Sequence, residues 1–397
     1  MSGSFVVVGI GADGWDGLTR RAQTELAGAQ IILGSHRQLD LLPDLPARRE
    51  PWSSPMSAHL HRVLTDGHDG VRHVLASGDP MFHGIGTSIV RAVGADRVRV
   101  LPAVSSAALA CARLGWDLSE VRVVSLVTHD VATLADELDD GRDLLILSRG
   151  AATPSQVAKL LADNGYGWSS MTVLEQLGGD SETVVRGVAR TWARPPGDPL
   201  NIVAVGCVGP GRSRAPGRPD DAYVNDGQIT KQPIRALTVS ALAPVRRQLL
   251  WDIGSGSGSI AIEWLRAEPT GRAVAFERSS DRRDRLQDNA LHHGVHERLT
   301  VLGAAPQKCA AAPDPDAVFI GGGLDRELLS RVWELIPPGG RLVANAVTLE
   351  TQALLGEWFA NHGGTLRRHS VETAAPLGTM TTWRPALPIV QWVVDRP

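Results

Sequence analysis

The sequence predicts an α/β protein built from two domains, the second of which contains a doubly wound sheet. Three observations support this prediction. The chain has 397 residues, which is more than one typical domain contains. Short apolar runs alternate with helical patterns through both halves, as they do in α/β layers. A stretch rich in Gly, Pro and Arg, 209–224, is typical of a linker. We therefore predict domains at 1–208 and 225–397.

The first half contains seven apolar runs that predict strands of a largely parallel sheet. These runs are FVVVGIG (5–11), VRHVLAS (71–77), VRVLPA (98–103), VRVVSLV (121–127), DLLILS (143–148), MTVLEQL (171–177) and NIVAV (201–205). Helical patterns lie between some of them, as at 105–116 and 155–167.

The second half alternates more regularly between strands and helices. Strands are expected at 249–254, 272–278, 299–304, 316–323 and 341–347, and helices at 259–269, 282–294 and 325–336. This is the pattern of a doubly wound sheet, which binds its ligands at the carboxyl ends of the strands.

Composition argues against several classes of protein. The net charge of −3 gives no argument for a nucleic-acid or membrane partner. No apolar run is long enough to span a bilayer, and no basic region precedes the first apolar segment, so a cytoplasmic protein is expected. The three cysteines (Cys111, Cys207 and Cys309) form no CxxC pair and the histidines form no HExxH motif, so we expect neither a disulfide framework nor a metal site.

A glycine-rich loop follows the first predicted strand of the second half. Its residues are Gly254, Ser255, Gly256, Ser257 and Gly258, with Asp252 just ahead. This D-x-G-x-G-x-G spacing fits an S-adenosylmethionine loop, in which glycines let the backbone approach the ligand. A dinucleotide fingerprint would need glycine where Ser259 stands, so an NAD-dependent oxidoreductase is a disfavoured alternative. Glu277 ends the next strand, at about the distance where an acidic residue binds ribose hydroxyls.

The first half has its own glycine-bearing loop, SGDPMFHGIGT (77–87). It is not a phosphate loop, because no GK[ST] follows. Gly78, Asp79 and Pro80 predict a tight turn after a strand, and Ser105 and Ser106 predict the start of a helix, where a hydroxyl caps N–H groups. Turn and cap chemistry alone would explain these residues equally well.

The combination of motifs is more specific than any one of them. The first half contains, in this order, the motifs VVGIGADG, SGDPMFHGIGT, PAVSSAALA, ILSR and MTVLEQLGGDSE. With these motifs the first half resembles the tetrapyrrole methylase family. The second half contains, in this order, the motifs ITKQPIRALTVSALAP, WDIGSGSGS, VFIGGG and PPGGRLVANAVTLET. With these motifs the second half resembles the decarboxylating precorrin methyltransferases. The resemblance covers roughly 1–206 and 225–395.

The resemblance implies a two-lobed tetrapyrrole methylase fold for the first half and a Rossmann-like, class I methyltransferase fold for the second. It implies one S-adenosylmethionine site per domain and a small-molecule tetrapyrrole substrate, precorrin-6B. The second half would methylate carbon 15 and promote decarboxylation of the ring C acetate. The first would methylate carbon 5, giving precorrin-8 in cobalamin synthesis. The resemblance also implies a homo-oligomer. The alternative is a different tetrapyrrole or small-molecule acceptor, with one half serving only as a scaffold.

The resemblance also indicates site residues. Those expected at the cofactors are Gly78, Asp79, Pro80, Phe82, Ser105 and Ser106 in the first half, and Thr230, Gly254–Gly258, Glu277, Ala304, Ala305 and Gly321 in the second. Ala304 is a departure, because the family usually has an acidic residue there; adenine contacts would then rest on backbone groups of Ala304 and Ala305. Candidates for binding substrate carboxylates and bordering the substrate are His36, Arg37, His83, Arg149, Lys231, Arg235, Asn345 and Glu350. No protein nucleophile is expected, because the tetrapyrrole supplies the attacking carbon.

Overall fold

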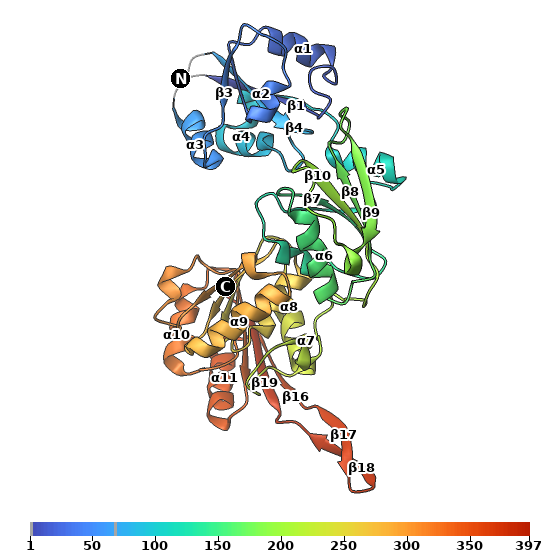
Figure 1. The fold of residues 1–397 in the computed structure, drawn as a ribbon. Helices are drawn as coiled ribbons and strands as arrows, with labels where there is room; N and C mark the ends of the chain where they lie inside the picture. The colour runs from blue at the N-terminus through green and yellow to red at the C-terminus, as the bar shows by residue number, and fades with distance from the viewer. Residues whose placement is uncertain (1–2, 67–69) are drawn as a thin grey trace. The chain divides into compact units, whose positions relative to one another are not determined.

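The computed structural model describes residues 3–66 and 70–397 (Figure 1). It divides into two compact units. Unit 1 comprises the chain up to Val131 together with Asp139–Gly211, and unit 2 comprises Ala132–Leu138 and Arg212–Pro397. The segment predicted as a linker therefore belongs to unit 2 from Arg212 onward. Among the helices within 3–66 and 70–397, none has the length and apolar character that crossing a bilayer requires.

The first sheet of unit 1 is parallel throughout, with strand order β3-β2-β4-β1-β5. Its strands are β1 (Ser4–Ile10), β2 (Ile31–Gly34), β3 (Arg48–Pro51), β4 (Val71–Ser77) and β5 (Val98–Leu101). The associated helices are α1 (Arg20–Ala27), α2 (His36–Asp40), α3 (Met56–Thr65) and α4 (Ile85–Val93). Ile10 pairs with Ser77, so the carboxyl ends of the two central strands lie together and place their following loops at one edge.

The second sheet of unit 1 is mixed, with strand order β6-β7-β10-β8-β9. Its strands are β6 (Arg122–Ser125), β7 (Asp143–Leu147), β8 (Ser170–Glu175), β9 (Thr183–Val188) and β10 (Asn201–Gly206), and helices α5 (Ser106–Leu114) and α6 (Thr153–Asp163) accompany them. Only β6 and β7 run parallel. The expectation of a largely parallel sheet is therefore wrong here. The short connection from β8 to β9 makes a hairpin, whereas parallel neighbours need a longer crossover.

Unit 2 is built around a seven-stranded sheet of order β13-β12-β11-β14-β15-β19-β16. Its strands are β11 (Leu249–Ile253), β12 (Arg272–Phe276), β13 (Leu299–Leu302), β14 (Ala317–Ile320), β15 (Arg341–Ala346), β16 (Thr365–His369) and β19 (Ile389–Asp395). The first five in this order are parallel, and β19 is antiparallel to both neighbours. The chain order reverses between β11 and β14, which is the switch point where such sheets bind ligands.

Helices and a hairpin complete unit 2. The helices are α7 (Gln232–Leu242), α8 (Ser259–Ala267), α9 (Ser280–His292), α10 (Arg326–Leu335) and α11 (Leu349–His362). Two apolar clusters form the core, one around Trp251 and Trp392 and the other around Trp264. Strands β17 (Glu372–Leu377) and β18 (Met380–Pro385) form a separate hairpin that projects from the unit as an arm (Figure 1).

Candidate cofactor and substrate sites

The glycine loop of unit 2 lies at the switch point, between β11 and α8. Gly254 has a φ of +71°, and a Cβ there would lie 2.6 Å from the carbonyl oxygen of Gly322, which follows β14. Glycine is therefore required at this position both by backbone conformation and by close approach. The backbone N–H of Gly321 donates to the carbonyl of Ile253 at 3.0 Å. The loop, Gly321 and the ends of two neighbouring strands thus form one edge.

Glu277 connects this loop to the end of the next strand. Its carboxylate accepts one hydrogen bond from the N–H of Gly256 at 3.0 Å and another from the N–H of Ser279 at 2.9 Å. The residue is only 4% exposed. Each carboxylate oxygen has a second lone pair, so Glu277 can still accept from ribose hydroxyls.

Two buried polar atoms, one in this loop and one just ahead of it, have no partner within the described residues: Oγ of Ser257 and Oδ1 of Asp252. The other oxygen of Asp252 accepts from the N–H of Ala261 at 3.1 Å. Burial raises the pKa of Asp252 to about 7, the Ala261 hydrogen bond opposes this, and the nearby Glu277 carboxylate adds to it. Buried polar atoms are normally paired. These two therefore fit a ligand that brings hydrogen-bonding groups, as the amino-acid part of S-adenosylmethionine does.

Other predicted residues of unit 2 lie on neighbouring segments. Ala304 and Ala305 follow β13, and the carbonyl of Ala304 accepts from the N–H of Lys308 at 3.0 Å. Thr230 precedes α7, and its carbonyl accepts a hydrogen bond from the Arg235 guanidinium.

Unit 1 contains a cavity of about 380 Å³ lined by residues from both of its sheets. It gathers most of the residues predicted for the first half, namely Arg37, Gly78, Asp79, Phe82, His83, Ser105 and Ser106. Its volume lies in the usual range for small-molecule sites. Predominantly apolar walls with a few polar groups fit a nucleoside-like cofactor such as S-adenosylmethionine.

The lining of this cavity depends on tight turns. Gly78 has a φ of +59°, and a Cβ on Gly9 would lie 2.3 Å from the Gly78 carbonyl oxygen, so the turn is closely packed against the end of β1. The Asp79 carboxylate accepts from the N–H of Met81 at 2.8 Å. Ser105 caps α5, since its hydroxyl accepts from the N–H of Ala108 at 3.1 Å.

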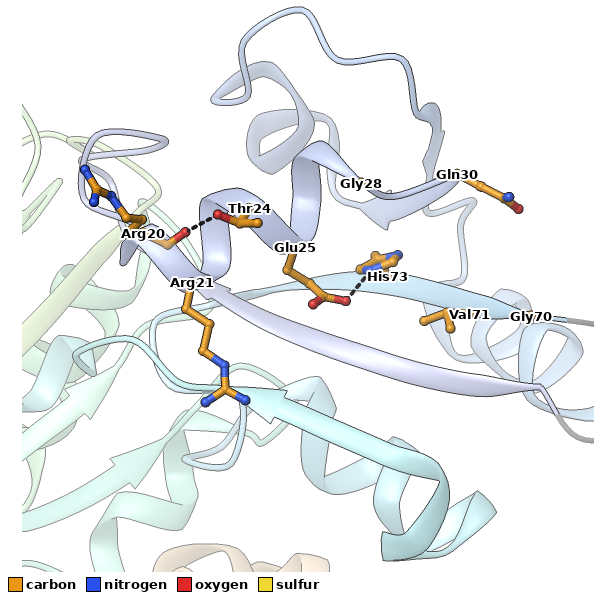
Figure 2. Close-up of a pocket in the computed structure, with 9 residues that line it drawn as sticks. All are labelled: Arg20, Arg21, Thr24, Glu25, Gly28, Gln30, Gly70, Val71 and His73. Carbon is orange, nitrogen blue, oxygen red and sulfur yellow. Dashed lines mark hydrogen bonds and ion pairs between the residues drawn. The ribbon is translucent and has the colours of Figure 1, made fainter.

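A larger hollow of about 810 Å³ lies elsewhere in unit 1, where α1 meets the start of β4 (Figure 2). Arg20, Arg21 and Thr24 line it from α1, and the Nε2 atom of His73 lies 3.0 Å from the Glu25 carboxylate. The described residues that line this hollow include none of those predicted from the sequence. It adjoins the amino end of β4, whereas the smaller cavity adjoins the carboxyl end, where α/β sheets bind ligands.

Comparison with known proteins identifies both parts of the chain. Residues 4–193 match the tetrapyrrole (corrin/porphyrin) methylases and residues 221–396 match the precorrin methyltransferase domain. The decarboxylating precorrin-6Y C(5,15)-methyltransferase of Mycobacterium tuberculosis is 45% identical over 397 residues, which cover 99% of this chain and 100% of that protein. The chain belongs to this family. The resemblance stated from the motifs is confirmed.

Further relatives carry the same name. The decarboxylating precorrin-6Y C(5,15)-methyltransferase of a Sinorhizobium species is 41% identical over 394 residues, covering 98% of this chain and 95% of that protein. The crystal structure of the C-terminal domain of precorrin-6Y C5,15-methyltransferase from Rhodobacter capsulatus is 49% identical, covers 47% of this chain and all of that one, and has a TM-score of 0.45. Members of this family are methyltransferases that use S-adenosylmethionine.

The expectation that Arg235 binds substrate needs correction. Arg235 is completely buried, and its Nε donates to Glu263 at 2.6 Å while Nη1 donates to Asp220 at 3.1 Å. The guanidinium also lies 4.9 Å from the centre of the Tyr223 ring. Each of its three nitrogens donates within unit 2. Arg235 therefore holds α7 in place and is not accessible to a substrate carboxylate.

The other substrate candidates of unit 2 differ in accessibility. Lys231 is well exposed before α7, with Nζ 3.5 Å from the Asp220 carboxylate. Glu350 is exposed in the first turn of α11. Asn345 is occupied internally, because its amide donates to the Thr238 hydroxyl at 2.9 Å and accepts from Gln391 at 3.0 Å. Lys231 and Glu350 are thus the accessible members of this group.

In unit 1, Arg37 and His83 face the cavity. Arg37 donates to the Ser77 hydroxyl at 3.0 Å; burial lowers the pKa of its guanidinium, and the nearby Asp198 carboxylate partly opposes this. The pKa of His83 is lowered chiefly by burial, and also by the nearby charges of Arg122 and His129. The neutral form of this imidazole is therefore favoured. His36, Pro80 and Arg149 are not among the described residues that line the cavity, and Arg149 instead donates to the carbonyl of His129 at 3.0 Å.

Sequence reasoning missed two residues that hold these sites together. Asp198 accepts from the Gln176 side chain at 2.9 Å and from the N–H of Leu200 at 2.7 Å, which fixes a loop that lines the unit 1 cavity. Asn289 on α9 hydrogen-bonds the glycine loop of unit 2. Neither lies in a recognisable motif, so only the tertiary contacts reveal them. In the described part of the chain, no group of His, Cys, Asp and Glu is arranged to hold a metal ion.

Proposed function

We propose that this chain methylates precorrin-6B at carbons 5 and 15 and decarboxylates its ring C acetate, giving precorrin-8. The observation that carries the proposal is that both units have a glycine-bearing site at the carboxyl ends of their parallel strands, in a chain that aligns along 99% of its length with a decarboxylating precorrin-6Y C(5,15)-methyltransferase.

The two activities are assigned to different parts of the chain. The domain at 225–397 would methylate carbon 15 and promote decarboxylation, and the domain at 1–208 would methylate carbon 5, with 209–224 joining them. Each would bind one S-adenosylmethionine. The match of residues 221–396 to the precorrin methyltransferase domain supports this division.

The residues act by binding and positioning. When bound, S-adenosylmethionine supplies an electrophilic methyl group, and a carbon of the tetrapyrrole is the nucleophile. In unit 2, the glycine loop, Asp252 and Glu277 would hold the methyl donor; in unit 1, the turn at Gly78–Pro80 and the start of α5 would do so. Alignment of donor and acceptor, with exclusion of water, then supplies the acceleration. Decarboxylation likewise depends on delocalisation of electrons into the macrocycle.

The substrate carries many carboxylates, so cationic groups should border each site. Arg37 is the best-placed cation in unit 1, because it lines the cavity. Lys231 is the best-placed candidate in unit 2, because it is exposed next to Thr230.

The mass of the product formed from precorrin-6B and excess S-adenosylmethionine tests the proposal. Two methyl additions with loss of one carbon dioxide are expected. One methyl addition with decarboxylation would restrict activity to the second domain. No change in mass, while S-adenosylmethionine binds, would point to another acceptor and overturn the assignment.

We also propose that the enzyme works in the cytoplasm as a homo-oligomer. The arm supports self-association, because large apolar side chains on it and just after it are open to solvent. Leu377, Met380 and Trp383 of the arm are 60–72% exposed, and Leu387, which follows β18, is 75% exposed. Exposed apolar patches of this kind often mark protein interfaces. Light scattering of the wild type and of Trp383→Ser tests this, and an unchanged monomeric mass for both would refute it.

A further inference from the structure

A short segment of unit 2 lies along the glycine loop. Residues 224–231, which we call the strap, connect the buried Tyr223 to α7. The carbonyl oxygen of Gln228 would lie 3.7 Å from a Cβ on Gly256, so the strap backbone is in contact range of the loop. Ile229 packs against the core cluster around Trp264. The strap therefore contributes to the wall of the site on the side of α9.

One side chain bonds both the strap and the loop. The Asn289 side chain accepts from the N–H of Val224 at 2.9 Å and donates to the carbonyl of Val224 at 2.9 Å. It also donates to the carbonyl of Ser257, in the glycine loop, at 2.9 Å. Asn289 is only 2% exposed. Both of its donor hydrogens are therefore used, one on each segment.

A second residue of α9 holds the strap more weakly. Arg282 donates to the Asp226 carboxylate at 2.8 Å and to the Gln228 side chain at 3.0 Å. The side chains of Arg282 and Asp226 are 27% and 31% exposed. Solvent-accessible ion pairs of this kind contribute little. Removal of the buried Asn289 amide would leave three polar groups unpaired, so this amide contributes more to stability. Asn289 is thus the principal link.

We infer that Asn289 is a positioning residue for the S-adenosylmethionine site of unit 2. By bonding Val224 and Ser257 at once, it holds the strap against the loop and fixes the orientation of the Ser257 carbonyl before the ligand enters. Binding then does not have to order either segment, which is the advantage of preorganisation. This inference rests on the proposed function, because it assumes that the loop binds S-adenosylmethionine.

Steady-state kinetics of the full chain test the catalytic consequence. Asn289→Ala removes all three hydrogen bonds, and Asn289→Asp keeps an acceptor for Val224 but loses both donations. We expect the KM for S-adenosylmethionine in carbon-15 methylation to rise about 10-fold or more, as lost buried hydrogen bonds imply, with kcat at saturation changed much less. Carbon-5 methylation by the first domain should stay unchanged. Gln287→Ala removes an exposed amide from the same helix and is the matched control.

Hydrogen exchange separates positioning from a general loss of structure. In both Asn289 variants, peptides covering 224–231 and 254–258 should exchange faster, whereas peptides from β11 and β14 should not. Unchanged exchange in the strap and loop, or equal loss of protection throughout unit 2, would overturn the inference. This readout needs no substrate, so it remains valid if the proposed function fails. That failure would appear separately, as a wild-type protein without protection of 254–258 by S-adenosylhomocysteine or without methyl transfer.

Discussion

The carboxylate of Asp136 lies 3.0 Å from the guanidinium of Arg266, although 130 residues separate them, and both side chains are almost completely buried in unit 2. Arg298 approaches the same carboxylate at 3.0 Å and Arg214 at 3.5 Å. Asp136 belongs to the short segment 132–138, which lies in the first half of the sequence but in the second unit of the structure. A single carboxylate from the first half of the sequence therefore pairs with three arginines from the second half.

Removal of Asp136 should destabilise unit 2. Asp136→Ala leaves Arg266 buried without its partner, and breaking a buried ion pair in this way costs about 3–5 kcal/mol. Urea unfolding followed by hydrogen exchange should show the loss in peptides of α8 and β11, with unit 1 unaffected. Asp284→Ala, at an exposed position of α9, is the control. Equal stability of Asp136→Ala and the wild type would contradict the importance of this pair.

Replacement of Gly254 should abolish carbon-15 methylation and decarboxylation. Gly254→Ala places a Cβ 2.6 Å from the Gly322 carbonyl oxygen in a backbone conformation that disfavours L-residues. Gly356→Ala is the control, because a Cβ at this position of α11 would have open space around it, with no atom of the described residues beyond its own helical turn within 4 Å. Product masses should show one methyl addition without decarboxylation for Gly254→Ala and the full reaction for Gly356→Ala. A full reaction by both variants would remove the loop from the catalytic site.

The stability of unit 2 should depend on the ionisation of Asp252. Its pKa in the folded protein is about 7, compared with 3.8 ordinarily. Between these values the folded protein holds a proton that the unfolded chain has lost. The contribution of the Asp252 carboxyl to the free energy of unfolding is therefore fully present below about pH 4, and it is lost as the pH rises to about 7. Asp252→Asn has no charge to bury, so its urea midpoint should fall less than that of the wild type between pH 5 and pH 8. Parallel pH profiles would show that Asp252 is ionised throughout.

Loss of Arg37 should weaken substrate binding in the first domain. Arg37→Gln removes a cation that lines the unit 1 cavity, and a lost charged hydrogen bond corresponds to about a 10- to 100-fold rise in the KM for the tetrapyrrole. Carbon-15 methylation should not change. Arg20→Gln alters a cation of the other hollow in the same unit and should have no effect on either reaction. An effect of Arg20→Gln equal to that of Arg37→Gln would place the substrate elsewhere.

The regular parts of the fold were predictable because their patterns are local. The five parallel strands of unit 2 appear as apolar runs between helical patterns, and the glycines of 254–258 follow the first of them. The polar strand β3 and the projecting hairpin β17–β18 were missed, and neither has a buried apolar run. Strands β2, β9, β16 and β19 were missed as well, although β2 and β19 contain buried apolar residues. The antiparallel pairing of β8, β9 and β10 was missed as well, because pairing direction depends on the path of the chain between strands.

The residues of the candidate sites were likewise predictable only in part. The sequence by itself determined the two glycine-bearing turns, because such turns need particular residues at particular spacings wherever they occur. Only the tertiary structure decided that Arg235 is buried against Glu263, that Asp136 serves the second unit, and that Asn289 joins the strap to the loop. A side chain's function depends on its partners and its exposure to water, and both are set by residues that lie far away in the sequence.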